Sequence, residues 1–325
     1  MSTLSNFSGW LLALFQLALF AMAAPLLAGW IKWLKARLQN RRGSSPLQPY
    51  RDLHKLFGKE VLVAETASAV FRAAPYIVFG ATLLAVASLP LLTVKLPTAA
   101  IADMIVMVGF LALARFFLAL AGMDTGSAFG GMGASREMLV SALAEPAMLM
   151  AIFTLAMSAH STNLSSISSW VLNEGAILRP SFMFALLGLA LVAVAETGRI
   201  PVDNPDTHLE LTMIHEAMIL EYSGRHLALM EWAAQLKLLL YGVLVVNVFF
   251  PWGIAESFAP GALALGLGLG LAALTAKLLL LSMILAVSET VLAKMRLFRA
   301  PQFLNLAFLL AVLGLLSFVI LESGT

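Results

Sequence analysis

Eight long apolar runs constrain the fold of this chain more than any other feature of its sequence. Most reach the roughly 20 residues that a helix needs to cross a bilayer core. Because a span must satisfy its own backbone polar groups, runs of this length are expected to be helices. Only 12% of the residues are charged, against about 25% in a soluble domain. The sequence therefore predicts an all-α integral membrane protein with a single membrane domain over 1–325 and spans at 7–34, 71–92, 101–121, 138–159, 181–196, 229–250, 262–288 and 302–321.

The positions of lysine and arginine predict how these spans are oriented. One set of loops carries fifteen of these residues, whereas the opposite set carries only Lys95 and Arg179. Loops rich in lysine and arginine stay on the cytoplasmic side of a membrane. The basic loops are therefore expected in the cytoplasm, and an even number of spans places both termini on the outer side.

Segment 35–70, between the first two spans, is too polar to cross a membrane and is expected to form a cytoplasmic amphipathic loop. Its apolar residues recur at helical spacing, which predicts a short helix that lies at the interface or roofs a cavity. Pro46 and Pro49 suit the first turn of this helix, and Gly58 suits its end. A basic segment that only holds anionic lipid is the alternative. The apolar positions are Leu47, Tyr50, Leu53, Leu56 and Phe57.

The stretch 196–226 is the most acidic part of the chain. Its first thirty residues hold six of the eighteen acids and two of the five histidines. Pro201 and Pro205 interrupt any helix that enters from the fifth span, and a second break is expected at 223–224. Non-helical backbone at this depth survives only when it is buried in protein or lines water. The stretch is therefore predicted to be a re-entrant or interfacial acidic hairpin on the cytoplasmic side.

Charged residues also lie in or at the ends of other spans, at Arg115, Glu145, Glu231, Lys237 and Lys277. Ionisable residues at membrane depth are costly and commonly serve proton or ion pathways. We therefore expect a proton relay from the cytoplasm toward mid-membrane. Fixed ion pairs, for example between Glu231 and Lys237, are the structural alternative. The predicted relay residues are Glu145, Glu196, His208, Glu210, His215, Glu216, Glu221 and Glu231.

Other kinds of site are disfavoured. The pair His215 and Glu216 lacks the second histidine of the His-Glu-x-x-His zinc pattern, so no metal site is expected. The glycine-rich loop predicted at 122–136 does not follow a strand, which makes it a poor phosphate cradle. The chain has no cysteine and cannot supply thiolate ligands to an iron–sulfur cluster. We expect a non-catalytic membrane subunit whose cofactors lie in partner subunits, with no nucleic acid as partner.

The acidic hairpin resembles a signature of the proton-translocating membrane subunit shared by respiratory complex I, as its subunit 1 or H subunit, and the membrane-bound group 4 nickel–iron hydrogenases. The first cytoplasmic loop is similar as well, at 35–39, 42–43 and 47–49. Arg136 and Glu145 resemble the arginine and glutamate of the family's fourth span. The matching hairpin residues are Glu196, Thr197, Arg199, Pro201, Asp203, Glu210, Leu211, Glu221, Tyr222, Ser223 and Gly224.

Departures from the complex I pattern point to the hydrogenase branch. Gly198 stands where those relatives have asparagine, and 43–46 replaces their glycine-proline-asparagine loop. The run THLELTMIHEAMILEYSG is similar to subunits of formate hydrogenlyase, hydrogenase-4 and CO-induced hydrogenase complexes. In quinone-reducing relatives the first loop and this stretch frame the quinone tunnel. The changed loops therefore argue against a quinone site.

The resemblance implies a membrane anchor and proton-path subunit in a bacterial inner membrane. It implies a hydrogenase-like large subunit and an iron–sulfur small subunit on the cytoplasmic side, with antiporter-like membrane subunits beside the chain. Iron–sulfur clusters and a nickel–iron centre would lie in those partners, with no cofactor in this chain. Asp203 and Asp206 would join the relay at its entry. The charge-modulating cations would be Arg136, Arg199 and Lys237, and the residues contacting a quinone or a partner subunit would be Arg37, Arg42, Asp52, Lys55 and Lys59.

Three alternatives remain open. The chain could be the quinone-site subunit of a complex I relative, of the NADH:quinone oxidoreductase type, in which case a quinone would bind between the first loop and the acidic hairpin. It could be a passive scaffold for soluble redox subunits, in which case loss of single acids would lower complex yield rather than turnover. An independent secondary transporter would need two repeated halves, and the sequence contains no internal repeat.

Overall fold

The structure, a computed structural model, describes residues 2–93, 102–174, 179–203, 213–254, 263–293, 295 and 299–322. Within these residues the regular structure is helical, and the only β contact is an isolated bridge between Asp103 and Asn163. This confirms the all-α prediction. The elements are α1 (Ser2–Leu38), α2 (Gln48–Phe57), α3 (Ala69–Ala87), α4 (Met104–Asp124), α5 (Ala128–Ala159), α6 (Leu164–Glu174), α7 (Pro180–Glu196), α8 (His215–Ile219), α9 (Gly224–Val248), α10 (Leu263–Val291), α11 (Ala300–Ser317) and the π-helical turn η4 (Phe318–Glu322).

Within the described residues, seven helices are long and apolar enough to cross a membrane, namely α1, α3, α4, α5, α9, α10 and α11. Helix α7 is also apolar but has only 17 residues. At 1.5 Å per residue it is about 25 Å long, which is shorter than the roughly 30 Å hydrocarbon core. The chain is thus a multi-pass membrane protein, and the number of eight spans stays a prediction.

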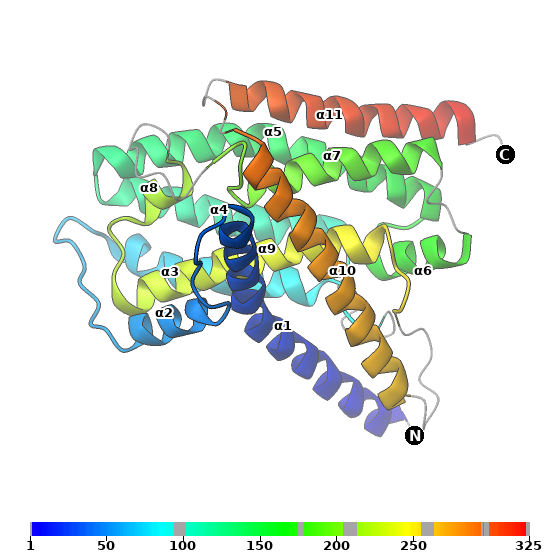
Figure 1. Ribbon diagram of the computed structural model, residues 1–325, viewed down its shortest axis with the longest axis horizontal. Coiled ribbons are helices and arrows are strands. Elements are labelled where there is room, and N and C mark those ends of the chain that lie inside the picture. The colour runs from blue at the N-terminus through cyan, green and yellow to red at the C-terminus, as the bar shows by residue number, and fades with distance from the viewer. Residues whose placement is uncertain are drawn as a thin grey trace.

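The long helices form a bundle in which most run in a common direction (Figure 1). Helices α3, α4, α5, α7, α9 and α11 lie along this direction, whereas α1 and α10 run obliquely across one side. The short helices α2 and α8 lie at one end of the bundle, and α6, which the sequence did not lead us to expect, lies at the other with both termini. The ends of the bundle therefore differ, and the acidic residues near α8 share an end with the basic residues of α2.

Helix α5 begins ten residues before the predicted fourth span, and α4 continues to Asp124, so the prediction of a loop over 122–136 is wrong except for 125–127. Ser127 caps this helix by accepting a hydrogen bond from the amide of Gly130 (3.2 Å), as N-cap serines do. Glycine is required for close packing rather than for a loop. A Cβ at Gly133 would lie 2.9 Å from both the Ala217 Cβ and the Ile214 carbonyl oxygen of the acidic hairpin.

Helix α2 forms where the amphipathic pattern predicted it. Pro49 lies in its first turn and is buried with Leu53, whereas Leu47 and Phe57 are exposed. The hydroxyl of Tyr50 donates a hydrogen bond to the carbonyl oxygen of Met22 on α1. This hydrogen bond holds α2 against α1, and the charged side of α2 is exposed.

The predicted break at 223–224 is present. Ser223 is extended and precedes α9, and Gly224 has a positive φ of 53°, a conformation that favours glycine. A Cβ at this position would lie 2.5 Å from the carbonyl oxygen of Glu60. The start of α9 therefore packs against the segment that follows α2, which brings the first loop and the acidic hairpin together.

Candidate functional site

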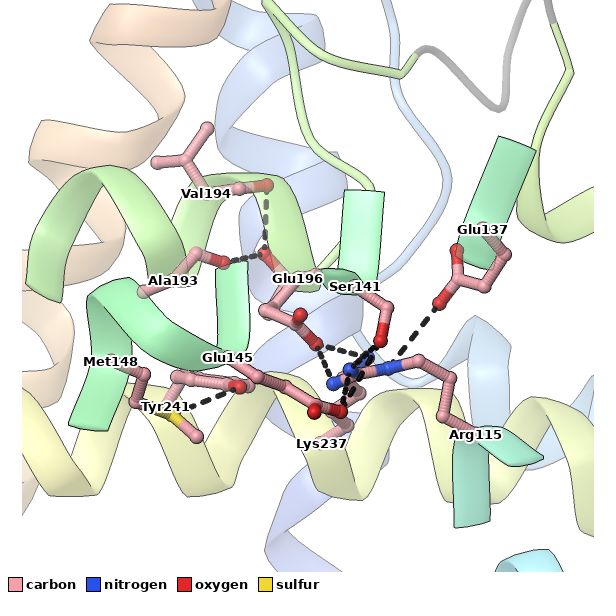
Figure 2. A network of polar contacts seen from close by, with 11 residues as sticks. Arg115, Glu137, Ser141, Glu145, Met148, Ala193, Val194, Glu196, Lys237 and Tyr241 are labelled. Carbon is pink, nitrogen blue, oxygen red and sulfur yellow. Dashed lines mark hydrogen bonds and ion pairs between the residues drawn. The ribbon is translucent and has the colours of Figure 1, made fainter. Parts of the chain in front are cut away.

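A group of buried ions lies where α4, α5, α7 and α9 meet (Figure 2). Arg115 of α4 is at its middle, and its side chain is only 3% exposed. We call this group the Arg115 centre. Its members are Arg115, Glu137, Ser141, Glu145, Glu196 and Lys237.

The guanidinium of Arg115 binds three carboxylates at once. Its Nη2 donates to Glu196 Oε2 at 2.7 Å, its Nη1 binds Glu145 Oε1, and its Nε lies 3.8 Å from Glu137 Oε1. Nη1 also donates to the hydroxyl of Ser141. A planar guanidinium with five donors suits this arrangement, which a single ammonium group cannot reproduce.

Glu196, the last residue of α7, has a second cation. Its Oε2 lies 2.8 Å from the Nζ of Lys237 on α9, and its side chain is 3% exposed. Lys237 therefore pairs with Glu196, not with Glu231 as the ion-pair alternative supposed. Beside these residues, Tyr241 lies fully buried, with its hydroxyl 3.4 Å from the sulfur of Met148 (Figure 2).

A smaller ionic group, the Glu289 clamp, lies just beyond the end of α7. It consists of Lys35, Arg199 and Glu289. The buried carboxylate of Glu289, near the end of α10, accepts from Arg199 Nη1 at 3.1 Å and lies 3.3 Å from Lys35 Nζ. This clamp joins α1, α10 and the turn after α7. The carboxylate partner of Arg199 is therefore Glu289, which is not one of the predicted relay residues.

Two predicted residues hold the base of the acidic hairpin together. Asp203 is buried, and its Oδ2 accepts a hydrogen bond from the amide of Ile214 at 3.3 Å. Arg136 of α5 donates to the carbonyl oxygen of Met213 at 2.8 Å. These contacts hold Asp203 close to Ile214, and Met213 close to α5. Asp206, His208 and Glu210 lie outside the described residues.

The remaining predicted relay residues lie nearer the end of the bundle. Glu231 of α9 is partly buried and faces the charges of Glu216, Lys32 and Asp52. Glu221 is exposed. The Nε2 of His215 is buried and has no hydrogen-bond partner among the described residues. The structure thus brings Glu145, Glu196 and Lys237 together in one centre. It places Glu216 near enough to Glu231 for their negative charges to interact.

Tyr222 shows how tightly the end of the hairpin is packed. Its ring stacks on Phe71 with 4.0 Å between ring centroids, and its hydroxyl donates to the Phe71 carbonyl oxygen at 2.9 Å. Burial, together with the negative charge of Asp124, raises the pKa of the Tyr222 phenol above its usual value. Its hydroxyl therefore stays protonated and acts as a structural donor.

The residues expected to contact a quinone or a partner subunit are all exposed at the basic end. The guanidinium of Arg37 lies 5.3 Å from the ring centroid of Trp33. Asp52 Oδ1 accepts a hydrogen bond from the side-chain amide of Gln48 at 2.9 Å. The exposed set is Arg37, Arg42, Asp52, Lys55 and Lys59. Their exposure leaves them accessible to a neighbouring molecule.

Sequence reasoning gave no role to three central residues. Arg115 was recognised as a charge at membrane depth, but its partners were not. Glu137 and Glu289 were missed because they fall one residue outside the predicted spans. One signal was present for Glu137, since Glu137, Ser141 and Glu145 are spaced four residues apart and such residues share a helix face.

The family model described as NADH dehydrogenase matches residues 11–321. The chain is 36% identical to formate hydrogenlyase subunit 4 of Escherichia coli (strain K12), over 93% of this chain and 95% of that protein. It is 35% identical to hydrogenase-4 component C of the same strain, over 93% of each chain. It is also 29% identical to an NADH-quinone oxidoreductase subunit of Syntrophobacter fumaroxidans, over 74% of this chain and 78% of the relative.

The fold is also found in a solved structure. A chain of the membrane-bound sulfane sulfur reductase, an archaeal respiratory membrane complex, superposes with a TM-score of 0.81. The match covers 95% of this chain and 99% of that chain at 20% identity, which shows a shared fold. Together with the family match over nearly the whole sequence, these likenesses show that the chain belongs to the NADH dehydrogenase family.

Proposed function

We propose that this chain is the membrane subunit of an energy-converting hydrogenase complex and carries protons between its acidic hairpin and the Arg115 centre. The proposal is supported by its likeness, over almost the full length of each relative, to a formate hydrogenlyase subunit and a hydrogenase-4 component. It places the complex in a bacterial inner membrane, with the basic end in the cytoplasm and both termini outside.

The charge of the Arg115 centre is the observation that carries the proposal. Among the residues that the structure describes, three carboxylates, Glu137, Glu145 and Glu196, face two cations, Arg115 and Lys237. One negative charge is therefore not neutralised when every group is ionised. An excess charge in a medium of low polarity is costly. Binding one proton removes this excess, so the centre is suited to accept and release a single proton.

The route to this centre starts in the cytoplasm. Asp203 and the rest of the acidic hairpin form its entry, Glu216 and Glu231 lie along it, and Glu196 and Glu145 receive the proton. Arg199, Arg136 and Lys237 set the charge around the route. A negative charge arriving at the cytoplasmic end attracts a proton into the route, because electrostatic interactions are weakly screened in a low dielectric medium.

The electrons would come from partner subunits. A peripheral hydrogenase-like large subunit and an iron–sulfur small subunit would dock on the cytoplasmic end, where the first-loop residues are exposed. Their iron–sulfur clusters and nickel–iron centre would supply the redox chemistry. Antiporter-like membrane subunits would take up the translocated ion beside this chain.

The test is the variant Glu145→Gln in the intact complex, with Glu65→Gln as control because Glu65 is an exposed loop residue. Glu145→Gln is expected to abolish proton translocation while hydrogen oxidation with an artificial dye continues. Glu65→Gln is expected to preserve both. If Glu145→Gln translocates normally, the proton-path proposal is rejected. If it only lowers the yield of complex, with translocation per complex unchanged, the passive scaffold is favoured instead.

A further inference from the structure

Helix α1 contains a proline, Pro25, in its interior. Proline has no N–H, so the carbonyl of Ala21, its usual helical partner, loses that hydrogen bond. In a membrane helix such a carbonyl needs a new donor from a neighbouring element. The indole Nε1 of Trp232 on α9 donates to the Ala21 carbonyl oxygen at 2.8 Å. The acceptor freed by the proline of α1 is therefore bound by α9.

The next carbonyl of α1 is bound by a third helix. The hydroxyl of Tyr50 on α2 donates to the carbonyl oxygen of Met22 and also has a backbone hydrogen bond with Leu26. Met22 and Leu26 are four residues apart and would bond to each other in an uninterrupted helix, so Tyr50 binds both members of one helical pair. We call this group the Pro25 latch, and its members are Ala21, Met22, Pro25, Tyr50 and Trp232.

Close packing holds the same three helices together around the latch. Helices α1, α2 and α9 all contact one another. A Cβ at Gly29, one turn further along α1, would lie 2.9 Å from the Cδ of Pro49 in the first turn of α2. The ring of Phe57, the last residue of α2, meets the ring of Trp232 edge-on, with 6.3 Å between their centroids. Helix α2 is thus held by α1 at its start and by α9 at its end.

Each helix joined by the latch carries one charged residue that acts at the same place. Glu231 immediately precedes the tryptophan of the latch, Asp52 follows its tyrosine by two residues, and Lys32 lies about two turns beyond its proline. Glu231 faces the charges of Lys32, Asp52 and, from the acidic hairpin, Glu216. Which of these charges lies close to Glu231 therefore depends on how the three helices are held.

We propose that Tyr50 and Trp232 are positioning residues, whose hydrogen bonds to the carbonyls of α1 hold α1 and α2 against α9 and so keep the charges of those two helices beside Glu231. The inference rests on the proposed function, in which Glu231 lies on the proton route, and deepens it by assigning the residues that fix the charges around this point. A merely structural latch would fasten the helices without affecting proton movement.

Conservative variants of the two donors test the proposal in the intact complex. Tyr50→Phe and Trp232→Phe each remove one donor and keep an aromatic ring. Loss of such a bond is expected to lower proton translocation per hydrogenase turnover roughly fivefold, which corresponds to about 1 kcal/mol. The controls Tyr76→Phe and Trp10→Phe change residues that are 51% and 48% exposed, and they are expected to leave this ratio unchanged. A lower yield of complex with a normal ratio overturns the positioning role.

Double variants show whether the latch acts through the charges. Trp232→Phe is combined with Lys32→Gln, and Tyr50→Phe is combined with Asp52→Asn. Because changes that act through one shared interaction are not additive, each double variant is expected to translocate like its charge variant alone. A further fivefold loss in the double variants overturns the proposal.

A separate variant distinguishes this proposal from the proposed function. Normal translocation by Glu231→Gln overturns the proton route through Glu231, and the latch proposal with it. Normal translocation by Tyr50→Phe and Trp232→Phe, together with a defect in Glu231→Gln, overturns the latch alone and leaves the proposed function standing.

Discussion

Replacing Arg115 by methionine removes the cation on which the buried centre depends. The change keeps a long apolar side chain but leaves Glu137, Glu145 and Glu196 with Lys237 alone. Removing one partner of a buried ion pair costs about 3–5 kcal/mol, because the other charge stays buried without compensation. Arg115 is 4% exposed overall, so this penalty applies without the reduction that solvent screening gives a surface pair.

The variant can escape this penalty by binding a proton. An ordinary glutamate is held in its ionised form at pH 7 by about 4 kcal/mol relative to the protonated form. Since the penalty and this preference are of similar size, we expect one carboxylate of the centre to become neutral in Arg115→Met. The net destabilisation should then be limited to about 3–4 kcal/mol, with the protonated carboxyl as its signature.

Two measurements on the purified complex check this expectation. Infrared absorption should show an additional protonated carboxyl group in Arg115→Met that disappears when Glu145 or Glu196 is also replaced by glutamine. Thermal unfolding should show the loss of stability. Arg72→Met is the matched control, because Arg72 is exposed and surface ion pairs are worth about 0–1 kcal/mol. Wild-type stability with no additional protonated carboxyl would refute the account of a centre bound together by Arg115.

Two further predictions concern packing and the second ionic group. Gly133→Ala should destabilise the chain by about 1–3 kcal/mol, because the new Cβ would lie 2.9 Å from Ala217. A Cβ at Gly131 would have no atom within 4 Å, so Gly131→Ala should be neutral or stabilise the chain by up to about 1 kcal/mol. Denaturant unfolding measures both variants, and equal effects of the two would contradict this prediction. Glu289→Gln should cost about 3–5 kcal/mol, since the carboxylate between Arg199 and Lys35 is 2% exposed, whereas Glu65→Gln should be silent in the same assay.

The long apolar runs predicted the fold class well because the bilayer is a strong constraint. A long apolar run must become a helix whatever its neighbours are, so α3, α4, α9 and α10 lie within a few residues of the predicted spans. The start of α5 was missed because a tertiary contact, and not the bilayer, determines its structure. Its glycines are typical of a loop, but at Gly133 the tertiary contact with the acidic hairpin requires a residue without a side chain.

The candidate site was predictable residue by residue but not as an arrangement. Acids and cations at membrane depth are recognisable, and the four-residue spacing from Glu137 to Glu145 places three polar groups on one face of α5. Which cation meets that face depends on how α4 and α9 are positioned against it. Glu231 was the expected partner of Lys237, but residues six apart do not share a face of a helix. The packing of α9 instead places Lys237 2.8 Å from Glu196.

The turn after α7 connects two ionic groups of opposite net charge. Glu196 ends α7 within the Arg115 centre, where three acids meet two cations, and Arg199, three residues later, enters the Glu289 clamp, where two cations meet one acid. Each group thus differs from neutrality by one charge, and the turn fixes the distance between them. Under the proposed function, a proton bound at the Arg115 centre would cancel its excess negative charge, and the electrostatic attraction between the two groups would be lost. This coupling would act through charge across a short turn, so it requires no large movement of the helices.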